Sequence, residues 1–187
     1  MKKIMVFLSL SLYVLATHAQ GKFLSLDKSP MDMCYYPPIY PILKIQDKAT
    51  EPLIARVIYS RPQKDGRVIF GDLEPYGKVW RLGANEATEI EFFKDIKTGK
   101  QKIKKGRYTM YAVLNPDKWT LILNKETDIW GAFKYDSTKD ILRVDVPVQK
   151  QTDRIEAFSM AFEKTNDSSA NLIMAWDDVL VKLPLSW

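Results

Sequence analysis

The sequence predicts an all-β fold: a single-domain antiparallel β-sandwich or jelly-roll-like barrel with a long central loop. Short runs rich in β-branched and aromatic residues recur along the chain, and turn-forming residues separate them. No stretch has a long 3.6-residue apolar period with capping residues. Many short strands joined by turns are typical of sandwiches and barrels, and the lack of an internal repeat or low-complexity linker favours one domain.

The first 19 residues have the layout of a secretory signal peptide. Lysines follow Met1, an apolar run extends from Ile4 to Ala16, and Thr17-His18-Ala19 places small residues at a cleavage site. The apolar run is shorter than the roughly 20 residues of a membrane-spanning helix. We therefore expect an exported protein, periplasmic or secreted, that is cleaved near Ala19 and has no transmembrane segment in its mature chain.

This cleavage decides which chemistries are open to the mature protein. His18 is the only histidine, so its removal excludes a Ser-His-Asp or Cys-His mechanism and any zinc site that needs histidine. Cys34 is the only cysteine, which excludes an intramolecular disulfide. The net charge of +5 is small and the lysines are dispersed, whereas nucleic-acid binding needs a dense basic face. We expect a non-catalytic protein without cofactor, metal or nucleic-acid partner. The oligomeric state stays open.

Residues 20–41 are predicted to form an extended Pro/Tyr-rich arm before a β-sandwich domain of residues 42–187. The segment "SPMDMCYYPPIYP" at 29–41 contains four prolines and three tyrosines. Proline fixes φ and lacks a backbone donor, so we expect this segment to be extended and not helical. Such an arm commonly covers the edge of a sheet.

Within the domain, apolar alternation and turn residues place the strands. Asn115-Pro116-Asp117-Lys118 predicts a hairpin turn, and "KTGK" at 97–100 predicts another. Pro147 predicts that its strand lies at a sheet edge or ends in a bulge, and Asp177-Asp178 predicts a turn. The predicted strands are Leu53–Tyr59, Glu89–Phe93, Tyr108–Leu114, Trp119–Leu123, the "ILRVDVPV" run at 141–148, Arg154–Glu163, Asn171–Trp176 and Val179–Leu183.

Five motifs occur in one order: "YSRP" at 59–62, "GRVIFG" at 66–71, "PYGKVWRLGANEAT" at 75–88, "GRYTMYAV" at 106–113 and "WGAF" at 130–133. In this order the chain resembles the exported bacterial proteins grouped as domain of unknown function 2911. The resemblance covers nearly all of the mature chain and implies export and one domain. It supplies no catalytic assignment. The sequence departs from the family's usual Pro-Ala-Gly turn at Lys104-Lys105-Gly106.

The central loop, Ile69 to Thr88, holds the candidate ligand-binding residues. Its glycines do not match a P-loop or a dinucleotide fingerprint. An arginine fork can bind a carboxylate, an asparagine supplies a donor and an acceptor, and aromatic rings can form a wall for a sugar. Trp130 is predicted to be a core aromatic instead. The candidates are Arg81, Asn85, Glu86, Tyr76 and Trp80, with Arg61 and Arg67 nearby in sequence.

Three functions stay open on these residues. The first is a non-catalytic domain that binds a small polar ligand, carboxylate-bearing or sugar-like, or another protein. The second is a hydrolase with Glu86 as its acid or base. The third is a structural envelope protein, in which Arg81 and Glu86 pair with each other to hold the loop. A second carboxylate facing Glu86 across a cleft would favour the hydrolase.

Overall fold

The computed structural model describes residue 23 and residues 25–187, and it confirms the all-β fold. The signal peptide predicted at residues 1–19 lies outside the described residues. One short helix and one 3₁₀ turn accompany the strands: α1 (Tyr40–Ile45) and η1 (Ser137–Lys139). The strands are β1 (Met31–Tyr36), β2 (Ala55–Ser60), β3 (Val79–Trp80), β4 (Glu89–Phe92), β5 (Ile96–Thr98), β6 (Gln101–Ile103), β7 (Gly106–Leu114), β8 (Lys118–Asn124), β9 (Asp140–Pro147), β10 (Gln149–Asn166) and β11 (Ser169–Ser186).

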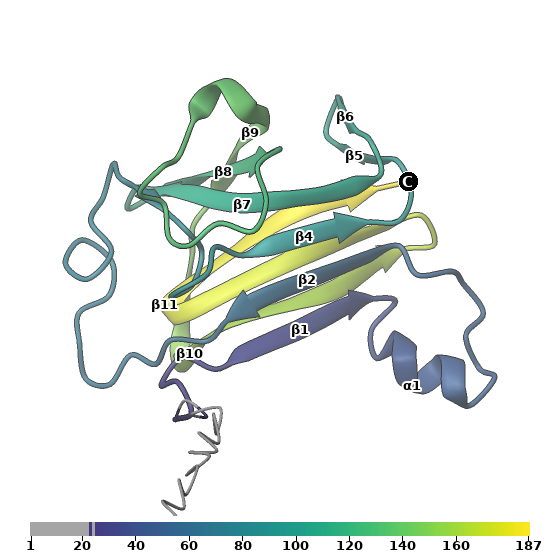
Figure 1. Cartoon of the computed structure of the whole chain (residues 1–187), viewed down its shortest axis with the longest axis horizontal. Coiled ribbons are helices and arrows are strands. Elements are labelled where there is room, and N and C mark those ends of the chain that lie inside the picture. The colour runs from purple at the N-terminus through teal and green to yellow at the C-terminus, as the bar shows by residue number, and fades with distance from the viewer. Residues whose placement is uncertain (1–22, 24) are drawn as a thin grey trace, which may run out of the picture.

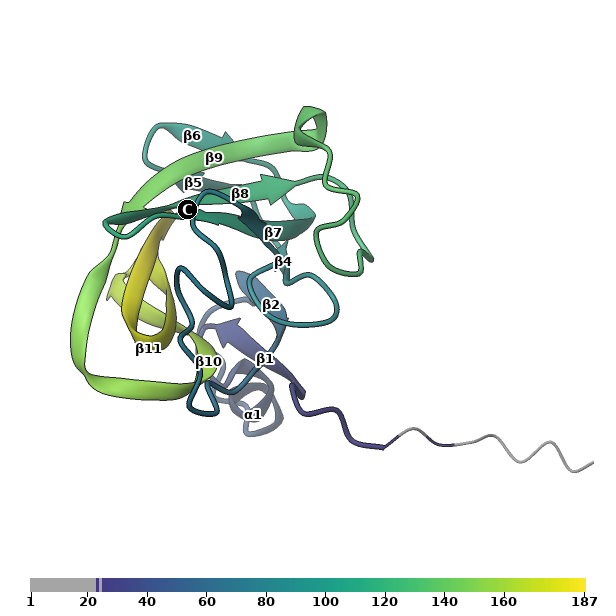
Figure 2. The same cartoon turned by 90° about the vertical axis from the view of Figure 1, so that its left-hand side faces the viewer.

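Two antiparallel sheets pack against each other (Figures 1 and 2). The larger sheet has the order β1-β2-β4-β7-β8-β9, with β3 paired to β7, and the smaller has the order β10-β11-β5-β6. In the described part of the chain the sheets do not close into a barrel, so the sandwich is the correct one of the two predicted architectures. The long hairpin of β10 and β11 forms most of the second layer.

The core lies between the sheets because alternate residues of each strand point to the same face. On β8, Trp119, Leu121 and Leu123 are all nearly completely buried. An aromatic cluster fills one end of this core. There Trp80 stacks on Trp176 with ring centroids 6.0 Å apart and meets Trp119 edge-on at 5.7 Å.

Both predicted hairpin turns are present. The amide of Asn115 donates to the carbonyl of Lys118 at 2.9 Å, which closes the turn between β7 and β8. The "KTGK" turn joins β5 to β6. Strand β9, which contains Pro147, is the last strand of the larger sheet, as predicted from the proline.

Two segments differ from their predicted conformations. The Pro/Tyr-rich segment is an edge strand followed by a helix: β1 pairs with β2 from Met31↔Ser60 to Tyr36↔Ala55, and α1 begins at Tyr40. A helix can form there because a proline in the first turn gives up no intrahelical hydrogen bond. Asp177 does not lie in a turn between two strands. It has a φ of 51° within the continuous strand β11, where the register with β10 shifts.

Candidate functional site

The inner side of the central loop belongs to the hydrophobic core. Trp80 is only 3% exposed, and its indole nitrogen donates to the carbonyl of Gly83 at 3.1 Å. The hydroxyl of the buried Thr88 donates to the carbonyl of Leu82 at 2.5 Å. These bonds satisfy loop backbone groups that water cannot reach. The ring of Trp80 therefore has no free face for a ligand.

Arg61 and Arg67 are occupied by structural contacts. Arg61 forms an ion pair with Asp32 at 3.0 Å and donates to Ser159 Oγ at 2.8 Å, so it links β1 to β10. Arg67 donates through Nε to the carbonyl of Lys64 at 3.0 Å and also bonds the carbonyl of Gln63. Neither guanidinium bonds another candidate residue, and Arg67 shares with Arg81 only an electrostatic effect on Glu74.

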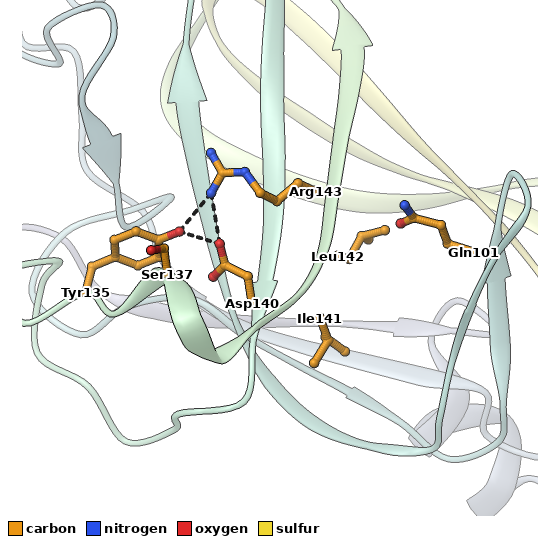
Figure 3. Close-up of a pocket in the computed structure, with 7 residues that line it drawn as sticks. All are labelled: Gln101, Tyr135, Ser137, Asp140, Ile141, Leu142 and Arg143. Atoms are coloured by element: carbon orange, nitrogen blue, oxygen red, sulfur yellow. Dashed lines mark hydrogen bonds and ion pairs between the residues drawn. The ribbon is translucent and has the colours of Figure 1, made fainter.

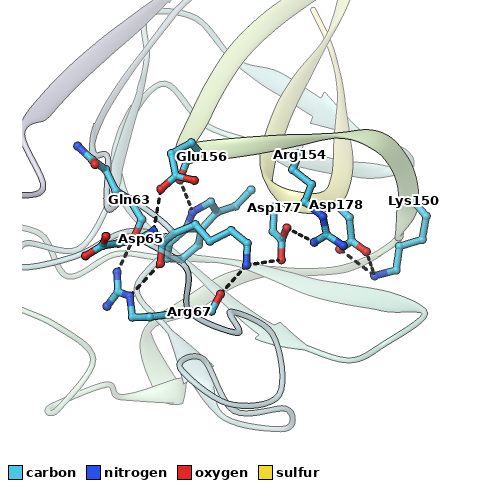
Figure 4. A network of polar contacts seen from close by, with 10 residues as sticks. Gln63, Asp65, Arg67, Lys150, Arg154, Glu156, Asp177 and Asp178 are labelled. Carbon is cyan, nitrogen blue, oxygen red and sulfur yellow. Dashed lines mark hydrogen bonds and ion pairs between the residues drawn. The ribbon is translucent and has the colours of Figure 1, made fainter.

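Figure 4 shows a polar network around Asp177 and Asp178 at the β11 bulge. Lys64, next to Gln63, belongs to it. Its ammonium lies 3.4 Å from the Asp177 carboxylate, and Arg154 binds the same carboxylate. Both carboxylate oxygens of Asp178 accept from Lys150 at 3.0 Å. Because the carboxylates of Asp177 and Asp178 both pair with basic side chains, these contacts stabilise the bulge.

Arg81 does not pair with Glu86. Its Nε is buried and has no hydrogen-bond partner among the described residues. Its charged neighbour is Glu74, which the sequence offers with Asp72 only as a lower-ranked carboxylate pair and not among the ligand-binding candidates. Burial raises the pKa of Glu74 to about 7, although the charges of Arg81 and then Arg67 act to lower it. Glu74 therefore titrates near neutral pH, on the inner part of the loop.

Asn85 and Glu86 lie on the outer side of the loop, against residues 125–136, which we call the aromatic loop. The amide of Gly131 donates to the carbonyl of Asn85 at 2.9 Å, and Glu86 forms an antiparallel bridge with Trp130. Trp130 is 61% exposed and Phe133 is 87% exposed, so the prediction of Trp130 as a core aromatic is wrong. Two motifs distant in sequence thus form one surface.

The aromatic loop is held rigidly despite its exposed rings. Ala87 donates its amide to the carbonyl of Ile129 at 2.8 Å, and Thr109 Oγ1 donates to the carbonyl of Glu126 at 2.5 Å. Arg107 forms an ion pair with Asp128 at 2.6 Å. Beneath the loop lies a small second core on the outer face of the large sheet, composed of Ala87, Tyr111 and Ile122 with Val79, Val113, Ile129, Ala132 and Tyr135.

Two cavities are lined by a candidate residue: one of about 480 Å³ is lined by Arg67 with Lys28, Ser29, Gln63 and Asp65, and the other is lined by Glu86. The Glu86 cavity, about 150 Å³, is lined by Glu86, Glu89 and Asp128 together with Met31, Ile58, Ala87 and Ile129. The Arg143 cavity, about 730 Å³, is lined by Gln101, Tyr135, Ser137, Asp140, Ile141, Leu142 and Arg143 (Figure 3). An apolar cavity of about 370 Å³ lies between α1, β1 and β10 and includes Cys34.

The structure thus brings together only Asn85 and Glu86 of the seven sequence candidates, and it adds Trp130. Tyr76 is 41% exposed, and its ring lies over Gly71 within the central loop. Sequence reasoning missed Trp130 because the motifs at 75–88 and 130–133 have no two-residue alternation of apolar and polar residues. Without it, the sequence does not indicate whether Trp80 or Trp130 faces the core. The short "WGAF" motif was the only signal that marked this loop.

Comparison with known proteins gives one match. The family model described as a protein of unknown function (DUF2911) matches residues 44–185. No curated protein and no solved structure matches the chain. The matched region contains the central loop, the aromatic loop, the whole lining of the Arg143 cavity and that of the Glu86 cavity except Met31. Of the apolar cavity it contains only Ala161 and Phe162.

Proposed function

This chain belongs to the DUF2911 family of proteins of unknown function, and on that premise we propose that it is an exported, non-catalytic domain that binds a small sugar-like ligand on the surface formed by Trp130, Asn85 and Glu86. The observation that carries the proposal is the exposure of Trp130, 61%, on a loop whose backbone is fixed. Two large exposed aromatic side chains on one loop, Trp130 and the 87% exposed Phe133, indicate an interaction site.

The chemistry of the surface fits a sugar. The face of an indole packs against the C–H groups of a sugar ring, while neighbouring polar groups bind its hydroxyls. Asn85 supplies both a donor and an acceptor, and the exposed Glu86 carboxylate supplies acceptors. Because the backbone of Trp130 is already paired with that of Glu86, little conformational entropy is lost when a ligand binds.

The proposed export rests on the sequence. The basic start, the short apolar run and the small residues before Gln20 support it. In the structure, no helix of the described residues is long and apolar enough to span a membrane. We accordingly place the protein in the periplasm or outside the cell.

The hydrolase remains the alternative, because Glu86 shares its cavity with two more acidic residues, Glu89 and Asp128. Both of these already have partners. Arg107 forms ion pairs with both carboxylates, and Glu89 also accepts from the amide of Asp128 at 2.6 Å. The cavity of about 150 Å³ is also smaller than the roughly 300–1,000 Å³ of usual small-molecule sites. The geometry therefore supports binding better than hydrolysis.

The test is a titration of the purified mature protein with a panel of mono- and disaccharides, followed by tryptophan fluorescence and by NMR of the indole N–H signals. We expect saturable changes that disappear in Trp130→Ala and persist in Tyr76→Ala, which removes another exposed ring. If sugar binding were lost in Tyr76→Ala but kept in Trp130→Ala, the binding site would lie on the central loop instead. If no sugar binds, the structural envelope role is favoured, and hydrolysis that is lost in Glu86→Gln would establish the enzyme instead.

A further inference from the structure

We propose that the Arg143 cavity is a second binding site, which takes a small monocarboxylate through the free edge of the Arg143 guanidinium. The cavity measures about 730 Å³ and lies between η1, β9 and the β5–β6 hairpin, which contributes Gln101 (Figure 3). This volume is in the range of small-molecule sites. The proposed site uses none of the residues of the Trp130 surface. An experiment can therefore disprove carboxylate binding at Arg143 without disproving sugar binding at Trp130, and the reverse.

One terminal nitrogen of Arg143 is fixed by two neighbours. Its Nη1 donates to Asp140 Oδ2 at 2.8 Å and to the hydroxyl oxygen of Tyr135 at 2.8 Å. The Tyr135 hydroxyl in turn donates to the same oxygen of Asp140 at 2.5 Å. Figure 3 shows the three groups in contact beside the cavity. The guanidinium is thus held from one side only.

The groups that hold Arg143 are themselves fixed by the fold. The side chain of Asp140 is 8% exposed, and its Oδ1 accepts from the buried Asn124 at 2.8 Å. The ring of Tyr135 packs edge-on against Tyr111, with centroids 5.1 Å apart. Burial, and then the hydrogen bond with Asp140, raise the pKa of Tyr135 to about 12, so its hydroxyl stays neutral at physiological pH.

The remaining donors of Arg143 are free to bind a ligand. Its Nε and Nη2 make no hydrogen bond with any described residue, and the side chain is 47% exposed. These two N–H groups point to the same side of a guanidinium and match the two oxygens of a carboxylate. Because Asp140 and Tyr135 already orient the plane, a ligand loses less entropy than it would on a freely rotating arginine.

The local charge favours a singly charged ligand. Arg143 is positive and its partner Asp140 is negative, so the cluster is close to neutral, and a phosphate dianion would be repelled by Asp140 as well as attracted by Arg143. Ile141 contributes a partly exposed apolar side chain, while Ser137 contributes a hydroxyl group. A carboxylate attached to a short apolar body fits this lining best.

The experiment is isothermal titration calorimetry with sodium benzoate and sodium hexanoate, compared with phenyl phosphate and benzyl alcohol. We expect both carboxylates to bind with a Kd of about 1–10 mM and the other two compounds at least about tenfold more weakly. Arg143→Gln should weaken carboxylate binding about tenfold or more, and so should Arg143→Lys, which keeps the charge but loses the planar fork. The proposal is overturned if neither carboxylate saturates by about 20 mM, or if phosphate or alcohol binds as well.

Lys118→Gln is the matched control, since Lys118 lies on the neighbouring strand, is 46% exposed, and also pairs with an aspartate of β9. It should leave binding unchanged; a loss equal to that of Arg143→Gln would show general charge attraction and overturn the site. Tyr135→Phe keeps the ring but removes one of the two groups that hold Nη1, and we expect several-fold weaker binding with the fold intact. If Arg143→Gln does not fold, Tyr135→Phe still tests the proposal. Unchanged carboxylate binding in Tyr135→Phe would contradict the proposed role of Tyr135 in orienting the Arg143 guanidinium.

Discussion

A single hydroxyl group, that of Ser60, forms hydrogen bonds with both backbone polar groups of Ala84. Ser60 Oγ accepts from the Ala84 amide at 2.6 Å and donates to the Ala84 carbonyl at 2.5 Å. This joins the end of β2 to the start of the "GANEAT" segment. The neighbouring Gly83 has a φ of 156°, and a Cβ there would lie 2.8 Å from Ser60 Oγ, so only glycine lets the loop approach this closely.

Ser60→Ala is therefore expected to destabilise the protein by about 1–3 kcal/mol, because it leaves an amide and a carbonyl of the loop without partners. Urea unfolding followed by circular dichroism measures the change. Ser168→Ala, in the exposed turn between β10 and β11, is the control and should stay within about 0.5 kcal/mol of wild type. Equal stability of the two variants would mean that the Ser60 contacts do not hold the loop.

Truncation to alanine should reduce the stability of the protein strongly at Trp80 and hardly at all at Trp130. Trp80→Ala removes a ring that packs on Trp176, Trp119 and Phe158, and we expect a cost of about 3–5 kcal/mol. Trp130→Ala removes an exposed ring and should change the free energy of unfolding by less than about 0.5 kcal/mol. Thermal and urea denaturation of the two variants check this. A large destabilisation by Trp130→Ala would place that ring in the core.

The sequence predicted the fold class well because its signals are local. The turn at Asn115–Lys118 and the edge position of Pro147 both follow from proline's missing donor and fixed φ. Strand order was not predictable, since it depends on pairing between distant segments. Strands β5 and β6, for example, join the smaller sheet through the single pair Ser186↔Lys97, although they follow β4 of the larger sheet in sequence.

The candidate site was predicted only in part for a related reason. The two-residue period that assigns a face to a strand residue ends where the strand ends. Nothing in the loops therefore distinguishes the buried Trp80 from the exposed Trp130. Asn85 and Glu86 were identified by their side-chain chemistry. Their contact with the aromatic loop is made by backbone hydrogen bonds, which do not depend on the identity of the side chains and so leave no pattern in the sequence.

The thiol of Cys34 should be inert in the folded protein. Burial, and then the charge of Asp32, raise its pKa to about 12, so almost none is present as the reactive thiolate at pH 8. We expect its alkylation by iodoacetamide to be about a hundredfold or more slower than in the urea-unfolded chain. Mass spectrometry of timed samples measures both rates. Similar rates in the two states would show that the apolar cavity around Cys34 is open to reagent and water.

Glu74 should make the stability of the protein fall as the pH rises towards neutrality. Its pKa is raised by burial from 4.5 to about 7, despite the opposing charges of Arg81 and Arg67. Between these pH values the folded protein retains a proton that the unfolded chain has lost. The contribution is thus fully present below pH 4.5, declines through this window, and is lost above about pH 7.

Glu74→Gln, which mimics the protonated side chain, isolates this contribution from those of other groups. The variant and wild type should be similarly stable near pH 4.5, and the variant should be more stable at pH 8 by about 1–3 kcal/mol, since one pKa unit corresponds to about 1.4 kcal/mol and partial solvent exposure reduces the effect. Urea unfolding at several pH values between these limits tests it. Asp72→Asn, an exposed change in the same loop, should follow the wild-type curve. A constant difference between Glu74→Gln and wild type at every pH would mean that Glu74 does not titrate in this window, and that Arg81 rather than burial controls its ionisation.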